Sequence, residues 1–566
     1  MAVTKLDALV VGAGFGGLYQ LYSLLKLGLS VKVIDQAGDV GGTWYWNRYP
    51  GAMSDTEAFA YRYSWDKDDL QHYPWTERYV KQPEVLAYLR HVVKRHDLRR
   101  HIQFNTEFLG AAYDEAGRLW RVQTSSGVME AHYLITALGI LNATNWPDIP
   151  GIDVYRGELY HTSRFPETYD FKGKRVGVVG CGSTGVQVIS AIAKDVKTLT
   201  CFQRRPQYTI PANDGPVSKE YRDRINKDYD AIWDHVKTSA SGMGFEESKV
   251  SALSVSEEER NRVFEECWRT GNGLRFNFGL FADIATNREA NEAACVFIRN
   301  KIRSIVKDPE TARKLTPWEP FARRPLCDTG YYETFNRENV ELVDLKATPI
   351  VELTEDGIQT SDGKTHELDV IIMATGFDAF DGSYNRVCIR GRNGETLRDH
   401  WAIRPSTYLG TAVSGFPNFF MISGPLSAFS NVPPALEMHV EFITGIIARA
   451  KELVEEDLVG GRVNGTSGMN NGEAAAAAAA IKRRVELEAL PEAEADWFDK
   501  CTELCTKTLY WETKSWFWGD NVKGKGHRVL FFLGGLGAFN NALLEAAAAG
   551  YKGFRPFCGI WHGPRK

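Results

Sequence analysis

Near its start the chain reads ALVVGAGFGGLYQLYSLLKLGLSVKVID (residues 8–35). Four apolar residues lead into closely spaced glycines, which predicts a short buried strand running into a glycine loop over Ala8–Gly12. Apolar residues then recur at helical spacing from Leu18 to Leu27, and Val31–Asp35 reads as a second strand. A strand, a glycine loop, a helix and a second strand in this order predict one βαβ unit of a parallel α/β sheet.

The glycine loop has the spacing of a dinucleotide-binding site. Gly12 permits the tight turn, Gly14 lets a pyrophosphate approach the backbone, and Gly17 lets the helix pack on the strand. Asp35 ends the second strand, where a carboxylate binds the ribose hydroxyls of an adenosine. Because this carboxylate would repel a 2′-phosphate, the first site is predicted to take FAD or NAD rather than NADP.

The same pattern occurs a second time in the chain. A strand, a glycine loop, a helix and a strand are predicted at Arg175–Gly180, Gly180–Gly185 (GCGSTG), Val186–Ala193 and Thr198–Gln203. Here the second strand is followed by Arg204 and Arg205 instead of an acid, and guanidinium groups bind a 2′-phosphate. The second site is therefore assigned to NADPH. Two bound dinucleotides indicate that hydride passes from NADPH to a flavin, which then acts on a further compound.

The length of 566 residues predicts two or three domains. Charged and apolar residues alternate at helical spacing in Ser256–Cys267 and Glu292–Lys307, and strands return at Val340–Val343 and Val370–Met373. We therefore predict an α/β protein with two Rossmann-like domains. The expected boundaries are residues 1–143 and 376–566 for a discontinuous FAD-binding domain, and residues 144–375 for an NADPH-binding domain with a helical insertion at about 217–318.

Composition excludes several other classes of protein. The net charge of −5 provides no basic field for nucleic acid. The N-terminus lacks the features of a signal peptide, and no apolar run approaches the length of a membrane span. Only Cys501 and Cys505 lie close together in sequence and no further ligands stand near them, so no metal site is predicted. The nine cysteines are interpreted as reduced thiols of a cytoplasmic protein. A loop at Gly460–Gly472 and the alanine run Ala474–Ala480 carry no chemistry.

Three further strings resemble type I Baeyer–Villiger monooxygenases. The string GGTWYWNRYPG (41–51), followed by Asp55, is similar to the flavin-side motif of this family. The string YRGELYHTSRFP (155–166) resembles its linker fingerprint through Gly157, His161 and Pro166, and Ala374–Asp378 resembles the strand end that returns the chain to the flavin domain. The likeness extends from the first glycine loop to Gly553–Phe554. It is closest to the cyclohexanone-oxidising members, through YSWDK (63–67), DIATN (283–287) and RPLCD (324–328).

The linker string departs from the family pattern at two positions. Phe165 stands where the family has Trp, and Tyr155 stands where it has Phe. In the related flavin-containing monooxygenases, which oxidise nitrogen and sulfur, that Trp position is Phe or Tyr, so the linker alone does not separate the two groups. Asp55 and Arg324 favour the ketone-oxidising group. Arg323 replaces the family's Lys, and Lys523 replaces an expected proline.

The resemblance implies roles for particular residues. Arg324 lies beside the flavin and the nicotinamide, where its permanent charge keeps a flavin C4a-peroxide deprotonated for attack on a carbonyl, and Asp55 orients it. His161 couples domain motion to coenzyme handling, Trp516 contacts the nicotinamide coenzyme, and Arg323 acts with Arg204 on the 2′-phosphate. The predicted FAD site comprises Gly12, Gly14, Phe15, Gly16, Gly17, Asp35, Thr43, Trp44, Asp55 and Tyr61. The predicted NADP site comprises Gly180, Gly182, Ser183, Thr184, Gly185, Gln187, Arg204, Arg205, Arg323, Arg324 and Trp516.

The predicted activity is the NADPH- and O2-dependent conversion of ketones, cyclohexanone among them, into esters or lactones. A small ketone and O2 are the expected partners, without an obligate protein partner, nucleic acid or membrane. Oxidation of sulfides or amines is the alternative that Phe165 supports. A non-catalytic FAD-binding sensor is disfavoured by the intact second glycine loop and Arg204. A flavin disulfide reductase is excluded because it needs a cysteine pair near the first flavin motif, and no cysteine precedes Cys181.

Overall fold

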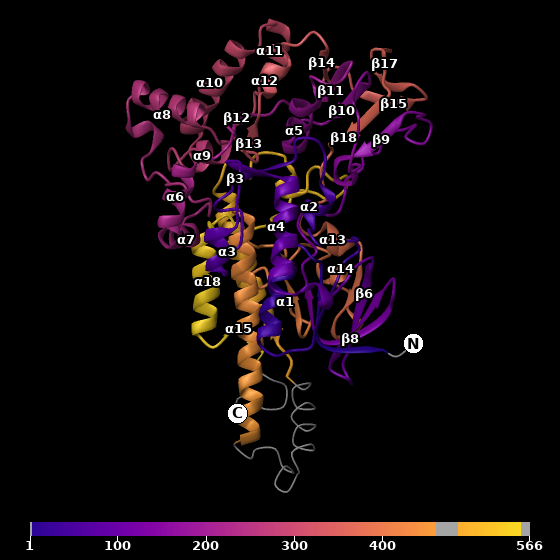
Figure 1. Cartoon of the computed structure of the whole chain (residues 1–566), viewed down its shortest axis with the longest axis vertical. Helices are drawn as coiled ribbons and strands as arrows, with labels where there is room; N and C mark the ends of the chain where they lie inside the picture. The colour runs from indigo at the N-terminus through magenta and orange to yellow at the C-terminus, as the bar shows by residue number, and fades with distance from the viewer. Residues whose placement is uncertain (1–2, 460–484, 556–566) are drawn as a thin grey trace.

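Two lobes, each built around its own sheet, make up the molecule in a computed structural model that describes residues 3–459 and 485–555. The first lobe, drawn in the lower half of Figure 1, holds an eight-stranded sheet in the order β19-β6-β7-β8-β1-β2-β5, with β20 paired to β8. Its strands are β1 (Thr4–Val11), β2 (Val31–Ile34), β5 (Ile102–Gln103), β6 (Phe108–Asp114), β7 (Leu119–Thr124), β8 (Gly127–Thr136), β19 (Cys388–Arg390) and β20 (Phe419–Met421). The pairs β1–β2 and β1–β8 are parallel, as the first βαβ unit requires.

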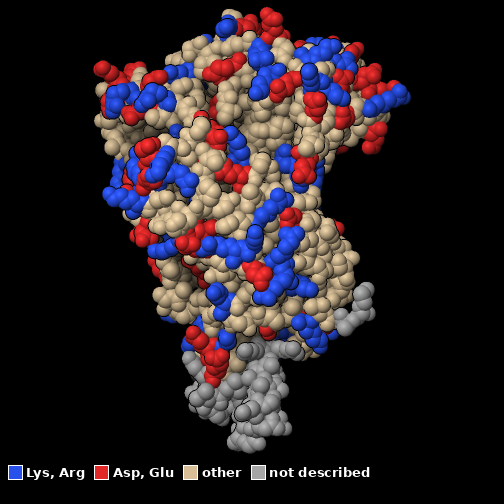
Figure 2. All heavy atoms as spheres, viewed as in Figure 1, with Lys and Arg blue, Asp and Glu red and all other residues tan. Residues whose placement is uncertain are grey.

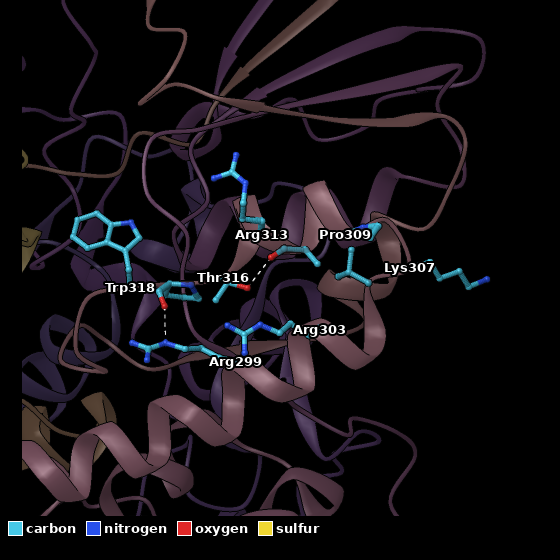
Figure 3. A pocket seen from close by; sticks show the side chains of 10 residues that line it. Arg299, Arg303, Lys307, Pro309, Arg313, Thr316 and Trp318 are labelled. Atoms are coloured by element: carbon cyan, nitrogen blue, oxygen red, sulfur yellow. Dashed lines mark hydrogen bonds between the residues drawn. The ribbon is translucent and has the colours of Figure 1, made fainter.

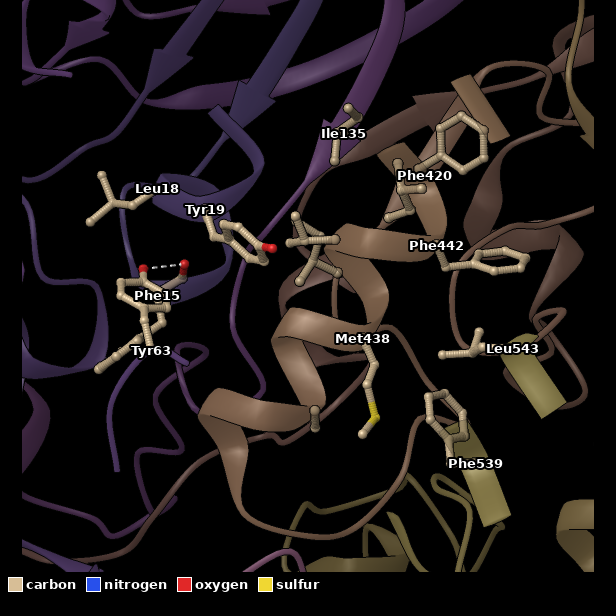
Figure 4. Packing of buried hydrophobic residues seen from close by; sticks show 14 of the residues in the cluster. Phe15, Leu18, Tyr19, Tyr63, Ile135, Phe420, Met438, Phe442, Phe539 and Leu543 are labelled. Atoms are coloured by element: carbon tan, nitrogen blue, oxygen red, sulfur yellow. Dashed lines mark hydrogen bonds between the residues drawn. The ribbon is translucent and has the colours of Figure 1, made fainter. Parts of the chain in front are cut away.

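Three helices of the first lobe share one apolar core. Helix α1 (Phe15–Lys26) follows the first glycine loop, and α15 (Val432–Val459) packs between α1 and α18 (Leu536–Ala548). Figure 4 shows Phe15, Met438 and Phe539 in this core, with Tyr63 donating its hydroxyl hydrogen to the carbonyl of Phe15 at 2.6 Å. The C-terminal region therefore completes the nucleotide-binding lobe formed by the N-terminal region.

The second lobe contains a five-stranded parallel sheet in the order β14-β11-β10-β18-β9. Its strands are β9 (Glu158–His161), β10 (Arg175–Val179), β11 (Thr198–Gln203), β14 (Val340–Asp344) and β18 (Val370–Met373), and α5 (Ser183–Ile192) follows the second glycine loop. The prediction of two Rossmann-like units is confirmed. Met373 pairs with His161, so the two strands that lead to the first lobe end side by side.

The helices of the predicted insertion divide between the two cores. They are α6 (Lys219–Lys227), α7 (Tyr229–Thr238), η3 (Ala252–Ser254), α8 (Glu257–Thr270), α9 (Gly273–Phe278), α10 (Arg288–Ile305) and α11 (Pro309–Leu315). Trp233 of α7 is buried in the core of the first lobe, whereas Phe264 of α8 and Ile298 of α10 are buried in that of the second. The insertion thus joins both lobes, which the helical spacing alone could not reveal.

Short elements surround the junction and the outer edges. Those in the first lobe or at the junction are α2 (Thr43–Trp46), β3 (Met53–Glu57), α3 (Lys67–His72), β4 (Tyr79–Lys81), α4 (Gln82–Arg95), η1 (Arg99–His101), α13 (Gly382–Asn385), η4 (Arg392–Gly394), α14 (Leu397–His400), β21 (Glu488–Ala489), α17 (Pro491–Thr506), η5 (Trp516–Trp518) and β22 (Phe554–Arg555). The others are η2 (Thr162–Arg164), β12 (Thr209–Pro211), β13 (Leu326–Asp328), α12 (Tyr331–Thr334), β15 (Ile350–Thr354), β16 (Gly357–Thr360) and β17 (Thr365–Glu367).

The surface carries both signs of charge, interleaved over the face drawn in Figure 2. Among the described residues, no helix combines the length and the apolarity needed to cross a membrane. The loop predicted at Gly460–Gly472 and the alanine run Ala474–Ala480 lie outside the described residues.

Replacing Gly17 by Ala tests whether the first glycine loop depends on close packing of α1. A Cβ at Gly17 would lie 1.8 Å from the Gly12 carbonyl oxygen, so the helix must move away from the strand. We expect Gly17→Ala to lower the free energy of unfolding by about 1–3 kcal/mol and to reduce the flavin bound per chain. Gly215→Ala is the control, because a Cβ there meets no atom within 4 Å. Equal Tm and equal flavin absorbance in the two variants would contradict the packing argument.

Candidate active site between two nucleotide loops

The first glycine loop is a tight cradle. Gly12 has a φ of +109°, and a Cβ on it would lie 2.4 Å from the Ala137 carbonyl oxygen. A Cβ on Gly14 would lie 3.5 Å from the Cα of Gly42, so this loop faces the start of the flavin-side string. A side chain is excluded at Gly12, and the absence of one at Gly14 leaves the backbone open to the close approach that a pyrophosphate needs.

Asp35 lies beneath this loop with only 8% of its surface exposed. Its carboxylate accepts hydrogen bonds from the backbone N–H groups of Ala13, at 2.6 Å, and Ala37, at 2.8 Å. Burial raises the pKa of Asp35, and the two backbone donors oppose that shift. The structure therefore gives Asp35 a role in holding the loop, and its contact with a ribose stays a prediction.

The other predicted flavin residues gather beside the loop. The Trp44 indole N–H donates to the Tyr61 hydroxyl at 3.1 Å, and the Tyr61 ring meets the edge of Phe15 at 5.8 Å between centroids. Thr43 is exposed at the start of α2, and Gly16 packs against Ile422 of the first lobe. The structure thus brings these four sequence-predicted residues, Phe15, Thr43, Trp44 and Tyr61, to one side of the cradle.

A buried ion pair links the lobes next to the second glycine loop. Arg324 Nη1 lies 2.6 Å from Asp55 Oδ2, and it also donates to the Ser183 hydroxyl at 3.4 Å. The Asp55 side chain is 3% exposed, and its Oδ1 accepts no hydrogen bond from any described residue. Burial acts to lower the pKa of Arg324, but the charge of Asp55 outweighs it and the pKa lies above its ordinary value. The guanidinium, with 25% of its side chain exposed, is therefore a fixed cation beside a buried carboxylate.

The second glycine loop has the geometry of the first. Gly180 has a φ of +112°, and a Cβ on Gly185 would lie 2.1 Å from the Gly180 carbonyl oxygen, whereas Gly182 faces open space. Ser183 and Thr184 begin α5. This loop can therefore receive a second pyrophosphate at a helix N-terminus.

Gln187, which the sequence placed in the NADP site, is held by protein contacts. Its Oε1 accepts from the Tyr49 hydroxyl at 2.9 Å, and its Nε2 donates to the Met53 carbonyl at 3.2 Å. Both partners come from the flavin-side region of the first lobe. Gln187 therefore connects the two lobes, through Tyr49 and Met53. The glycine pattern could not indicate this connection.

Three guanidinium groups converge beyond the second loop. The pKa of Arg323 is lowered to about 10. Burial is the largest cause, followed by the charge of Arg205 and, with a smaller effect, that of Arg204. Arg323 also pairs with Glu319, so one carboxylate offsets part of the positive charge. The crowding of three cations fits the predicted binding of a 2′-phosphate, whose charge would relieve their mutual repulsion.

Trp516 lies on a segment fastened to these arginines. Arg205 and Arg323 both donate to the Lys514 carbonyl, at 3.2 and 3.3 Å. Two residues later, Trp516 is half-buried and stacks on Phe380 at 6.0 Å between centroids. The structure thus places Trp516 near the second nucleotide site through the backbone of Lys514.

The same segment is anchored to the first lobe by contacts that sequence reasoning missed. The Asn521 side chain donates to the Phe377 carbonyl at 2.7 Å, and the Lys525 ammonium pairs with Asp378 and Asp381. The Lys525 side chain is only 5% exposed. In the sequence, the one indication of these contacts was Asp378, the acidic residue that ends the Ala374–Asp378 string.

The residues of the linker fingerprint are closely packed in this structure. His161 is 1% exposed, and its Nδ1 accepts from the backbone N–H of Ser163 at 3.1 Å. Phe165 is 5% exposed and packs with Tyr160 and Phe171 in the core of the second lobe, and Pro166 follows it. A Cβ on Gly157 would lie 2.2 Å from the Tyr155 hydroxyl oxygen. The Phe165 ring is thus part of the domain core, so its identity is weak evidence about the substrate.

Within residues 3–459 and 485–555, no three His, Cys, Asp or Glu side chains gather in a way that could hold a metal ion.

Replacing Arg204 by Ala tests the assignment of the 2′-phosphate. Each charge-assisted hydrogen bond to a phosphate contributes about 1.5–3 kcal/mol, so KM for NADPH should rise roughly 10- to 150-fold. KM for NADH should change little, because NADH lacks the phosphate. Steady-state kinetics with both coenzymes measure this, and Arg262→Ala, on an exposed arginine of α8, is the control. A parallel loss with NADPH and NADH would show that Arg204 does not distinguish them.

The stability of the fold should depend on the protonation of His161. Burial, together with the charge of Arg164, lowers the pKa of His161 from 6.5 to about 4. Because the folded pKa lies below the unfolded value, the stabilisation is fully present above pH 6.5 and is lost as the pH falls towards 4. We expect the fall in Tm between pH 7 and pH 4.5 to be smaller for His161→Gln, whose amide oxygen can still accept from Ser163. An unchanged pH profile in this variant would exclude His161 as a contributor.

Comparison with known proteins places this geometry in a family. Residues 9–265 match the family model described as "Pyridine nucleotide-disulphide oxidoreductase". The chain is 48% identical over 553 residues to phenazine N-monooxygenase PhzNO1 of Lysobacter antibioticus, covering 97% of each chain. It is 47% identical over 550 residues to cyclohexanone 1,2-monooxygenase of Acinetobacter sp., covering 97% of this chain and 96% of that protein.

A solved structure agrees over nearly the whole length. The crystal structure of cyclohexanone monooxygenase from Rhodococcus sp. Phi1 bound to NADP+ has a TM-score of 0.92 and 50% identity, covering 98% of this chain and 99% of that one. These relatives, together with the two glycine loops and the Asp55–Arg324 pair beside the second one, lead to one conclusion. The chain belongs to the Baeyer–Villiger monooxygenases, a family of FAD-containing, NADPH-dependent oxidoreductases.

Proposed function

We propose that this enzyme converts cyclic ketones such as cyclohexanone into lactones, with NADPH and O2 as co-substrates. The observation that carries the proposal is the buried Asp55–Arg324 pair beside the Ser183 hydroxyl of the second nucleotide loop. The names of several relatives support the substrate class, since they specify cyclohexanone and cyclopentanone.

The two cradles divide the cofactors between the lobes. FAD would be held by Gly12, Gly14, Asp35 and the aromatic residues beside them, and NADPH by Gly180–Gly185 with Arg204 and Arg323. We assign residues 1–143 and 376–566 to FAD binding and residues 144–375 to NADPH binding. When bound, FAD takes hydride from NADPH and activates O2 for transfer of one oxygen atom to the substrate.

The residues at the junction control where negative charge can develop. The Arg324 guanidinium stabilises an oxygen anion next to it, and it cannot give up its own proton at neutral pH. Asp55 fixes the direction in which Arg324 points, because its Oδ2 holds one guanidinium nitrogen at 2.6 Å. Trp516, half-buried against Phe380, and the segment around it are proposed to limit the access of water, which matters because activated oxygen is otherwise lost to solvent.

Two further properties belong to the proposal. A cytosolic location is supported by the cysteines, since all eight within the described residues are unpaired. The chain is proposed to act without a second protein, since both nucleotide cradles and the ion pair are formed by one chain.

Oxidation of a nitrogen heteroatom is the second candidate function. It is favoured by one observation: the relative named phenazine N-monooxygenase is as similar to this chain as the ketone-oxidising relatives are. The position of Phe165 in the core of the second lobe removes the other argument for this alternative.

Product analysis with the purified chain, FAD and NADPH in air separates the two functions. Cyclohexanone, cyclopentanone, phenazine and a thioether are tested in turn, and the product is identified by mass spectrometry. We expect lactone in proportion to NADPH consumed, and a loss of about 100-fold or more in lactone formation for Arg324→Ala. Arg262→Ala should retain full activity. Formation of a phenazine N-oxide with no lactone from either ketone would overturn the proposal in favour of the second candidate.

A further inference from the structure

A basic cavity lies outside both nucleotide cradles, between α10 and α11 of the second lobe. It is an open hollow of about 720 Å³, a volume within the range of small-ligand sites. Figure 3 shows the side chains of Arg299, Arg303 and Arg313 around it, with Trp318 on one side. Its lining residues are Arg299, Arg303, Val306, Lys307, Pro309, Ala312, Arg313, Thr316, Pro317 and Trp318. Four of the ten are cationic and none is acidic.

The positive charge of this cavity is only partly offset. Arg299 pairs with Glu292 at 2.7 Å, and Arg313 pairs with Glu310 at 2.7 Å. Arg303 donates only to the Asn300 side chain, at 3.4 Å, and within the described part of the chain neither it nor Lys307 pairs with a carboxylate. Two cations of the lining therefore have no carboxylate partner among the described residues, and Figure 3 shows Lys307 at the outer edge, directed away from Arg303.

An aromatic wall separates the cavity from the coenzyme arginines. Pro317 and Trp318 line both this cavity and a small hollow that contains Arg205, Glu319 and Arg323. Arg299 fixes the wall by donating to the Pro317 carbonyl at 2.8 Å. The Trp318 side chain is 58% exposed, and the Lys346 ammonium lies 4.2 Å from its ring centroid. An exposed indole beside free cations is the combination that binds a base together with its phosphates.

We propose that the α10–α11 cavity binds a phosphate-bearing small molecule of nucleotide size at a site separate from the coenzyme. Arg303 contacts the phosphate groups, Lys307 at the outer edge together with Arg299 and Arg313 adds to the field, and Trp318 packs against an attached ring. Guanidinium groups favour phosphate because their N–H donors match its oxygens.

Calorimetric titration of the holoenzyme tests this site. Saturating NADP+ is present throughout, so that the coenzyme arginines are occupied, and the probes are inorganic pyrophosphate, ATP and adenosine. We expect binding of pyrophosphate and ATP that weakens as salt is raised, and much weaker binding of adenosine. Tighter binding of ATP than of pyrophosphate would identify a nucleotide through Trp318, and equal binding would identify the phosphates alone. The first result supports the proposal, and the second would contradict the packing of a ring against Trp318.

Charge reversal locates the bound anion. Arg303→Glu combined with Lys307→Glu should weaken pyrophosphate binding at least ~10-fold, a loss of about 1.4 kcal/mol. The control combines Lys249→Glu with Arg269→Glu, which reverses two exposed charges on the same lobe outside the cavity. Flavin content and Tm establish whether each variant is folded. If the charge-reversed variant does not fold, Arg303→Gln combined with Lys307→Gln is used in its place. Absence of binding once NADP+ is saturating, or an equal loss in the control, would overturn the proposal.

Discussion

The ion pair between Asp55 and Arg324 is the interaction on which the site depends. Asp55 lies in β3 and Arg324 lies two residues before β13, so the pair joins segments that are far apart in the sequence. Removing Arg324 would leave the buried Asp55 carboxylate without its counter-charge, a loss of about 3–5 kcal/mol in comparable pairs. The same guanidinium reaches the Ser183 hydroxyl, so a single cation links the flavin-side region to the second nucleotide loop. Chemistry that needs both nucleotides must therefore take place around it.

A second constraint acts through the segment from Lys514 to Lys525. One end is tied to Arg205 and Arg323 by the Lys514 carbonyl, and the other end is tied to the first lobe by Lys525, Asp378 and Asp381. Between these anchors stands Trp516. The residues predicted to recognise the coenzyme therefore also position the segment that carries Trp516. The arginines proposed to bind NADPH are thus also the hydrogen-bond donors that hold the Lys514 carbonyl.

The sequence predicted the fold closely where short-range chemistry determines it. The strands Thr198–Gln203 and Val370–Met373 were predicted with their observed bounds, because Val370–Met373 is a continuous apolar run and Thr198–Gln203 follows a glycine loop and a helix in the βαβ order. Gln187 and Lys525 could not be assigned in this way, since their partners lie more than 130 residues away. Helical spacing also could not tell that α7 packs in the first lobe and α8 in the second, because an amphipathic face does not specify its partner. The pair of Asp55 and Arg324 was predicted only through the family resemblance.

We propose that Asp55 and Arg324 act as one unit in oxygen transfer. A double-mutant cycle on kcat/KM for cyclohexanone, with Asp55→Ala, Arg324→Ala and their combination, measures whether they do. The double variant should be no less active than the less active single variant, because either substitution already destroys the oriented cation. Losses that multiply in the double variant would show instead that the two residues act independently.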